Sequence, residues 1–390
     1  MKNFTLHLST KLFFGDDQEH KIGQIIDDYG FENVLIVCGQ SSVFKSGLID
    51  IVIDSLVKKN IRYHLYRGVT PNPEILFVNE ALALARQEKI DFILAVGGGS
   101  VIDVAKLVAV GYFYQGDPLD FNRHLVEAKA SIPLGVILTH SAAGSEMSTS
   151  SVISDSKNSF KQGFNTQFNR PLFAIENPKY TLTLSKEQTA IGIVDIMMHT
   201  LERYFNQSSK DLLADSLAEA LLKNVIINAK RLVKNPDDLE ARANIMLANT
   251  FSHNGITGMG KEQKMPVHMI EHALSGMFNE IPHGAGLAIL FPAWARFYQK
   301  LDREKFDRFA RNVFDLHYLD PDVNGQLGIK ALESLFVELG LDLSLQSFNL
   351  ELEDLDKIAL LATKNRHVEI YHHIKPLDYQ QVVEILKDCY

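Results

Sequence analysis

Roughly the first 180 residues alternate between two kinds of segment, and this alternation most limits the folds open to the chain. Short apolar runs at Val34–Cys38, Phe92–Val96 and Leu134–Leu138 are typical of buried strands. Amphipathic segments with helical spacing lie between them, such as Ile49–Lys58 and Glu74–Gln87. This order predicts parallel βαβ units, and therefore a Rossmann-like α/β domain with a doubly wound parallel sheet.

The pattern changes near Ser185, after which strand signals fade and helical periodicity dominates. The expected helices are Lys186–Phe205, Leu212–Leu232, Leu239–Asn254, Gln263–Phe278 and Gly284–Leu301. We therefore expect an α/β domain over residues 1–183 and an all-helical domain over residues 184–390. The length of 390 residues agrees, because a typical domain has about 150 residues.

Composition excludes several classes of protein. The 39 Lys and Arg against 48 Asp and Glu give a formal charge of −9, which argues against a general nucleic-acid binder. The segment Met1 to Asp16 lacks the apolar core of a signal peptide, and no run of about 20 apolar residues could span a membrane. The only two cysteines, Cys38 and Cys389, lie near opposite ends, which argues against a disulfide framework. We expect a cytoplasmic protein.

A glycine-rich turn, Gly97-Gly98-Gly99-Ser100, follows one predicted strand and opens a predicted helix at Val101–Val110. Glycines allow a ligand to approach the backbone, and the free N–H groups of a helix start suit a phosphate. Ser100 is expected to cap this helix, with Asp103 at capping-box spacing. The turn does not follow the G-x-G-x-x-G pattern, so a tight turn without a ligand remains the alternative.

Two more loops of small polar residues follow predicted strands. Residues 139–146 read T-H-S-A-A-G-S-E, and residues 39–42 read G-Q-S-S. Parallel strands end at one edge of a sheet, where open α/β sheets bind ligands, so we expect these loops to converge. Position 39, at the end of the strand, is a glycine and not the acidic residue that would hold a ribose 2′-hydroxyl, and Lys45 is near in sequence. Space and donors for a 2′-phosphate favour NADP(H) over NAD(H). A plain turn is the alternative at this loop.

Histidines point to a metal. Asp195 and His199 are spaced i, i+4, as are His268 and His272, and His283 precedes another predicted helix. A single such pair is more often an ordinary helix contact, but one carboxylate with three imidazoles suits catalytic Fe²⁺ or Zn²⁺. These residues alone leave open which three histidines bind, and His253 and His367 are further candidates with a less specific pattern.

These motifs resemble those of the iron-containing (group III) alcohol dehydrogenase family, above all its NADPH-dependent butanol dehydrogenase branch, over nearly the whole chain. Gly97–Lys106 matches the family pattern G-G-G-S-x-x-D-x-A-K, and Pro71–Pro73 matches its P-N-P loop. Gly192–Glu202 matches G-x-x-D-x-x-x-H-x-x-E, the first metal signature. His268–His272 followed by Pro282–Gly284 matches the second signature.

The resemblance implies a fold like that of dehydroquinate synthase, with a nicotinamide cofactor on the α/β domain and a metal between the domains. It implies four metal ligands: Asp195, His199, His268 and His283. His272 is not a ligand in the family and becomes a candidate for proton transfer. The cofactor contacts that it implies are Gly39, Ser41, Asn72, Gly98, Gly99, Ser100, Asp103, Thr139, Ser141, Ser148 and Lys161. In NAD-preferring members an Asp stands at the position of Gly39.

Two departures from the family pattern stand out. The spacing from His272 to His283 is eleven, where ten is common in the family, and the extra residue lies within Asn279–Ile281. The butanol dehydrogenase branch usually has Asp-Trp before the first histidine of the second signature, where this chain has Lys264-Met265.

We therefore expect a metal-dependent oxidoreductase that transfers a hydride between NAD(P)H and a primary alcohol/aldehyde pair such as butanol/butyraldehyde. Fe²⁺ is expected before Zn²⁺, and NADP(H) before NAD(H). Phe251, Met277 and Trp294 lie near the metal motifs in sequence, either as core or as the wall of a site for a medium-length or aromatic aldehyde. The expected assembly is a homodimer.

The sequence leaves three alternative functions open. A lyase of the dehydroquinate-synthase type would share the fold but consume no net NAD(P)H. A polyol oxidoreductase like glycerol dehydrogenase would differ in substrate. A non-catalytic binding protein would show no aldehyde turnover at all.

Overall fold

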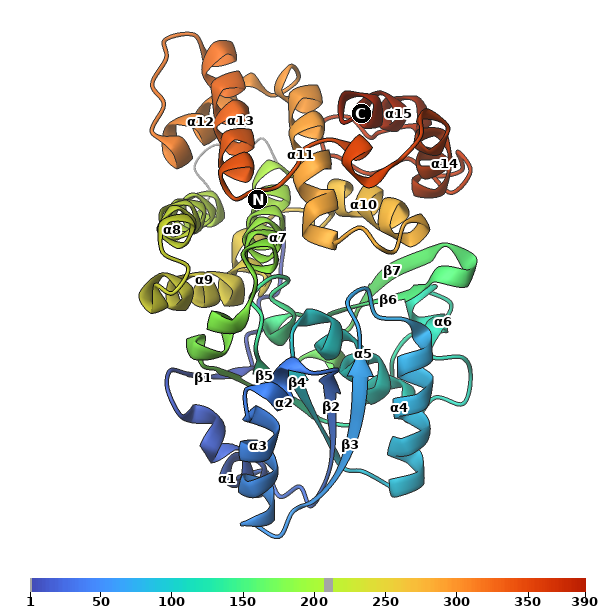
Figure 1. Ribbon diagram of the computed structural model, residues 1–390. Coiled ribbons are helices and arrows are strands. Elements are labelled where there is room, and N and C mark those ends of the chain that lie inside the picture. The colour runs from blue at the N-terminus through green and yellow to red at the C-terminus, as the bar shows by residue number, and fades with distance from the viewer. Residues whose placement is uncertain (1, 207–212) are drawn as a thin grey trace. The chain divides into compact units, whose positions relative to one another are not determined.

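The computed structural model describes residues 2–206 and 213–390, which form two compact units (Figure 1). One unit is His7–Thr183, and the other comprises residues 2–6 together with Leu184–Tyr390. Residues 2–6 thus belong to the helical unit and not to the α/β domain, which corrects the assignment made from the sequence. The backbone N–H of Lys2 donates to the carbonyl of Gly260 at 2.9 Å and ties this segment down.

A six-stranded sheet in which all neighbouring pairs are parallel forms the centre of the first unit. Its order is β1-β8-β5-β4-β2-β3. The strands are β1 (Lys11–Phe14), β2 (Asn33–Gly39), β3 (Arg62–Val69), β4 (Phe92–Gly97), β5 (Leu134–Leu138) and β8 (Phe173–Glu176). The three strands predicted from apolar runs are β2, β4 and β5 at its centre. Their continuous apolar sequences fit strands that are buried on both faces.

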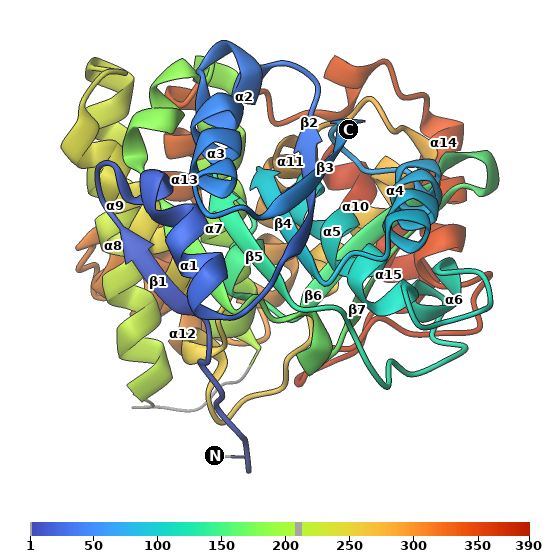
Figure 2. The ribbon, with the colours of Figure 1, turned by 90° about the horizontal axis from the view of Figure 1, so that it is seen from below.

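Helices cover both faces of this sheet (Figure 2). They are α1 (Ile22–Asp28), α2 (Ser42–Lys45), α3 (Leu48–Val57), α4 (Ile75–Glu88) and α5 (Gly99–Gly111). The short helix α6 (Leu119–Asn122) packs instead against residues 150–165. The core between the sheet and α1 and α3 uses alternate residues of β2, such as Val34, Ile36 and Cys38. Because successive side chains of a strand point to opposite faces, the residues between them face α4 and α5. This arrangement confirms the α/β fold class.

An antiparallel hairpin, β6 (Ser150–Asp155) and β7 (Phe160–Asn165), was not expected from the sequence. Its strands read S-S-V-I-S-D and F-K-Q-G-F-N and contain no continuous apolar run, so periodicity does not reveal them. Short 3₁₀ turns lie at Gln18–Lys21, Ser145–Met147, Ser156–Asn158, Gln167–Asn169, Pro178–Thr183, Ile256–Gly258 and Leu345–Phe348.

The second unit is helical. Its helices are α7 (Lys186–Phe205), α8 (Leu213–Lys234), α9 (Leu239–Ser252), α10 (Pro266–Met277), α11 (His283–Gln299), α12 (Arg303–Phe314), α13 (Pro321–Glu338), α14 (Leu352–Ala362) and α15 (Tyr379–Asp388). The helix expected at Leu212–Leu232 is α8, and Leu212 lies outside the described residues. A capping box between Ser185 and Gln188 starts α7, which runs over the predicted range. Within residues 2–206 and 213–390, no helix has the length and apolar character needed to cross a membrane.

Candidate active site

Three loops meet at one edge of the parallel sheet, as the sequence predicts. Register pairs Cys38 with Val96 and Gly97 with Leu138, so β2, β4 and β5 end side by side. The N–H of Thr139 donates to the carbonyl of Gly97 at 3.0 Å. A Cβ on Gly98 would lie only 3.1 Å from that of His140. The glycine turn and the loop after β5 are therefore in direct contact, and a larger residue at 98 would push them apart.

Ser100 does not cap α5, contrary to the sequence expectation. The N-cap is Gly98, whose carbonyl accepts the N–H groups of Val101 and Ile102 at 3.0 and 3.2 Å. Ser100 therefore lies within the first turn of the helix, because the helix begins earlier than the apolar pattern indicates. The N–H groups of Gly99 and Ser100, which precede these two bonds, remain suited to a phosphate.

Lys106 is fully buried and fastens the segment before β6. Its Nζ donates to the hydroxyl of Ser145 at 2.9 Å and to the carbonyl of Ser150 at 2.8 Å. Burial lowers the pKa of Lys106 to about 8, against the opposing charges of Asp103 and Glu146. A buried ammonium needs such acceptors, so the hydrogen bonds of this lysine hold the loop in its conformation.

Two of the residues expected at the cofactor take part in the same buried network. Asp103 accepts from the Ser145 hydroxyl at 2.7 Å and from the N–H of Val152 at 3.1 Å. The Ser148 hydroxyl is buried and accepts from Lys106 at 3.2 Å. The structure therefore gives both side chains a role in holding the loop, and the sequence alone did not show this.

The other expected cofactor residues differ in burial: Ser41 is exposed, Asn72 and Lys161 are half-buried, and Ser141 is buried. Lys161 donates to Oδ1 of Asn72 at 3.1 Å, and Asn72 has a left-handed φ of 50°. Ser41 is the N-cap residue of α2 but makes no capping bond with its side chain. The Ser141 hydroxyl is buried and has no hydrogen-bond partner among the described residues. A buried hydroxyl of this kind fits a ligand that supplies the missing bond.

The first metal signature lies on α7, where Asp195 and His199 are one turn apart. Nδ1 of His199 lies 2.9 Å from the carbonyl oxygen of Asp195 and 2.9 Å from its Oδ1. With the Nδ1 proton donated to this carbonyl, Nε2 keeps the lone pair that a metal requires. Both side chains are almost completely buried.

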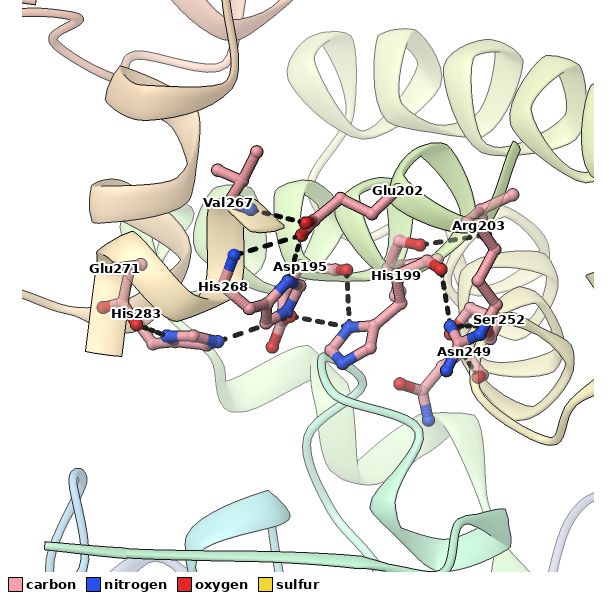
Figure 3. Close-up of polar contacts among 12 residues, drawn as sticks. Asp195, His199, Glu202, Arg203, Asn249, Ser252, Val267, His268, Glu271 and His283 are labelled. Carbon is pink, nitrogen blue, oxygen red and sulfur yellow. Dashed lines mark hydrogen bonds and ion pairs between the residues drawn. The ribbon is translucent and has the colours of Figure 1, made fainter. Parts of the chain in front are cut away.

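His268 and His283 reach the same carboxylate from two other helices (Figure 3). Nε2 of His268, on α10, lies 3.9 Å from Oδ1 of Asp195. Nε2 of His283, the first residue of α11, lies 4.0 Å from the same oxygen. On the other side of each ring, Nδ1 contacts a carboxylate, that of Glu202 for His268 and that of Glu271 for His283.

These residues fit a divalent cation. Oδ1 of Asp195 and Nε2 of His268 are buried, and neither has a hydrogen-bond partner of good geometry among the described residues. Two ligands about 2.1 Å from a tetrahedral ion lie about 3.4 Å apart. The separations of 3.9 and 4.0 Å from Oδ1 of Asp195 to Nε2 of His268 and of His283 are somewhat longer than this. An ion between these atoms would satisfy polar groups that are otherwise costly to bury.

Electrostatics at the site agree with this interpretation. Burial by itself raises the pKa of Asp195, but the surrounding imidazoles, led by His199, hold it well below its usual value. Burial lowers the pKa of His199. For His268, burial also acts to lower the pKa, but Glu202 and Asp195 outweigh it and raise the pKa to about 9. Metal binding at Nε2 of His268 would therefore release a proton.

The extra residue between His272 and His283 does not displace His283. It falls in the loop that joins α10 and α11, outside both helices. Gly284 then allows α11 to approach α7, because a Cβ at this position would lie 2.3 Å from the carbonyl oxygen of Ile191. Ile191 is one turn before Asp195, so this close contact brings His283 to the carboxylate.

Of the three remaining histidine candidates, two lie beside the proposed ligands and one does not. The ring of His272 lies 5.6 Å from that of His283 and 6.3 Å from that of His268, next to the ligand cluster. The centroid of the His253 ring lies 4.1 Å from that of His199, so His253 is beside the proposed ligands although its sequence pattern was less specific. His367 is exposed.

The three aromatic and apolar residues near the metal motifs in sequence differ in their burial. Trp294 is 1% exposed in the helical core, and Met277 packs against that core. Phe251 is exposed. Of the two interpretations left open by the sequence, the structure supports core for Trp294 and Met277.

Sequence reasoning gave no role to Glu202 or Glu271. The available signal for Glu202 was its place as the last residue of the first metal signature, two turns after Asp195, and the signal for Glu271 was its spacing, since it directly precedes His272. Neither spacing reveals a contact with a histidine on another helix.

Comparison with known proteins agrees with this geometry. The sequence pattern described as "Iron-containing alcohol dehydrogenase" matches residues 9–178, and that of "Fe-containing alcohol dehydrogenase family, C-terminal" matches residues 189–390. The chain belongs to the iron-containing alcohol dehydrogenase family. It is therefore an oxidoreductase of the alcohol dehydrogenase/aldehyde reductase type.

Relatives within this family match the whole chain. It is 37% identical to a probable NADH-dependent butanol dehydrogenase of Bacillus subtilis, over 99% of both chains. It is 34% identical to an NADPH-dependent aldehyde reductase of Escherichia coli, over 90% of both. The crystal structure of an NADH-dependent butanol dehydrogenase from Thermotoga maritima superposes with a TM-score of 0.95 at 36% identity, covering 99% of this chain and 98% of that one. The fold is thus the dehydroquinate synthase-like fold of this family.

Proposed function

We propose that the enzyme reduces medium-length aldehydes such as butyraldehyde with NADPH, and oxidises the corresponding primary alcohols in reverse. The observation that carries this proposal is the convergence of His268 and His283 on the buried Oδ1 of Asp195. With His199, these residues would hold a divalent metal, and Fe²⁺ is the proposed ion. One carboxylate and three imidazoles are a ligand set that suits Fe²⁺ and leaves a position open for substrate.

When bound, the metal would stabilise the negative charge that develops on the carbonyl oxygen, and the nicotinamide would supply the hydride. The chain's own residues orient the reactants and handle the proton. His272 lies next to His283 without being one of the proposed ligands, so its imidazole can donate a proton to the oxygen of the forming alcohol. An imidazole titrates near neutral pH, which suits it to this exchange.

The preference for NADPH rests on the end of β2. Gly39 supplies no carboxylate that would repel a 2′-phosphate, and Ser41 and Lys45 lie just beyond it in sequence. The names of the relatives do not decide this point, because they include NADH-dependent and NADPH-dependent enzymes.

The test is a cofactor-dependent screen of the purified protein after loading with Fe²⁺, Zn²⁺ or Mn²⁺. Oxidation of NADPH with butyraldehyde, faster than that of NADH, is the expected result. Turnover only with polyols such as glycerol would favour the polyol oxidoreductase alternative. If no aldehyde is reduced with any of these metals, the proposal is wrong.

We also propose a cytoplasmic homodimer. Cys38 and Cys389 are free and buried, which is compatible with a reducing compartment. Symmetric dimers are the commonest assemblies of soluble enzymes. Sedimentation equilibrium of the metal-loaded protein tests the dimer directly.

A further inference from the structure

We propose that Glu202 and Glu271 are positioning residues that set the metal affinity of the site by fixing the rings of His268 and His283. The inference rests on the proposed metal site and goes beyond its ligands. Each histidine contacts Asp195 on its Nε2 side and a buried carboxylate on its Nδ1 side (Figure 3). A carboxylate on Nδ1 fixes the tautomer with the proton on that nitrogen and leaves Nε2 free for a metal.

The two carboxylates are not equivalent. Glu202, on α7, also receives the backbone N–H of Val267 at 2.6 Å and that of His268 at 3.3 Å. These groups belong to the first turn of α10, whose N-cap residue, Met265, makes no side-chain capping bond. A carboxylate is favourable at a helix N-terminus, so Glu202 stabilises the start of α10 as well as orienting His268.

Glu271 holds a ring from the neighbouring helix. It lies on α10, is fully buried, and its Oε2 contacts Nδ1 of His283 on α11. Space for this carboxylate depends on a glycine, because a Cβ on Gly286 would lie 3.0 Å from Cγ and 3.2 Å from Oε1 of Glu271. The contact joins two helices at the point where His283 enters the site.

The inference predicts different effects for two conservative variants. In Glu271→Gln, the Zn²⁺ affinity should fall about 10- to 100-fold, while the melting temperature of the metal-free protein changes little. In Glu202→Gln, the Zn²⁺ affinity should fall similarly, and the metal-free protein should also melt roughly 5 °C lower, because the cap of α10 is weakened. The change in Zn²⁺ affinity reports the positioning role, and the change in melting temperature of the metal-free protein reports the role in folding.

The experiment measures Zn²⁺ dissociation constants by competition with a chromophoric chelator, together with melting curves of the metal-free full-length protein. Glu280→Gln is the matched control, since Glu280 is an exposed glutamate in the loop between the same two helices. Gly286→Ala is a second variant that displaces the carboxylate of Glu271 without removing it. It should weaken Zn²⁺ binding by a similar factor, although alanine favours the helix.

The outcomes distinguish this inference from the proposed function. Unchanged Zn²⁺ affinity in Glu271→Gln, with tight binding by the unmodified protein, overturns the inference and leaves the metal site intact. A drop in the melting temperature of metal-free Glu271→Gln as large as that of Glu202→Gln also overturns it, since the role would then be structural. If the unmodified protein binds no Zn²⁺, Fe²⁺ or Mn²⁺, the proposed function fails together with the inference.

Discussion

Nε2 of His283 lies 4.0 Å from Oδ1 of Asp195, even though one additional residue separates His283 from His272 relative to the usual family spacing. The loop between α10 and α11 contains the insertion, and the close contact of Gly284 with α7 fixes where α11 begins. The spacing of a motif along the chain is therefore less constrained than the packing of the helices that carry it.

His268→Ala should abolish metal retention and turnover together. The variant removes one of the four proposed ligands, so metal affinity should fall by at least about 100-fold. Metal content after dialysis, measured by atomic emission, checks this. His367→Ala, at an exposed histidine, is the control. A full metal equivalent in His268→Ala would show that the ligand assignment is wrong.

His272→Ala should retain the metal but lose rate. Removal of a proton-transfer group typically lowers kcat about 10²- to 10⁴-fold, while the proposed ligands remain in place. Metal analysis and steady-state kinetics on the same preparation test the two parts separately. Loss of the metal from this variant would make His272 a ligand in place of one of the other three histidines.

Gly39→Asp should move the cofactor preference from NADPH toward NADH. A Cβ at this position meets only the carbonyl oxygen of Val69, at 3.6 Å, so the side chain can be accommodated. The new carboxylate would repel a 2′-phosphate and accept a hydrogen bond from a ribose hydroxyl. The ratio of kcat/KM for the two cofactors should change by about 10- to 100-fold. Gly39→Ala separates the effect of charge from that of size, and an unchanged ratio in Gly39→Asp would place the 2′-phosphate elsewhere.

The helical unit should lose stability in acid partly through His372. This ring is buried, its centroid lies 3.8 Å from that of Tyr298 and 5.4 Å from that of Trp294, and burial followed by the charge of His373 lowers its pKa to about 3. Because the unfolded chain binds a proton near pH 6.5 and the folded one does not, stability is lost as the pH falls below 6.5. Between pH 7 and 5 the contribution of His372 should fall by roughly 2 kcal/mol.

Urea unfolding followed by the fluorescence of Trp294, the only tryptophan, measures this effect. The difference in unfolding free energy between pH 7 and pH 5 should be smaller in His372→Gln than in the unmodified protein. His317→Gln, at an exposed histidine, should keep the full difference. Equal pH dependence in all three proteins would contradict the prediction.

Much of the candidate site could be predicted because its residues lie on regular elements. Helical spacing places Asp195 and His199 on one face of α7, and three loops that follow parallel strands necessarily reach one edge of the sheet. Elements without a strong period were missed, such as the hairpin β6–β7, whose strands are rich in serine. The capping role expected of Ser100 was wrong because the terminal residue of a helix depends on which carbonyl accepts its first N–H groups.

The sequence by itself determined the α/β and helical fold classes, the glycine turn and the residue types of the proposed ligand set, since these depend on local periodicity and on residue type. Only the tertiary structure decided which carboxylates hold which imidazoles. Glu202 and His268, and likewise Glu271 and His283, lie on different helices and meet through helix packing. That packing is set by contacts such as Gly284 against Ile191, which have no signature in the local sequence pattern.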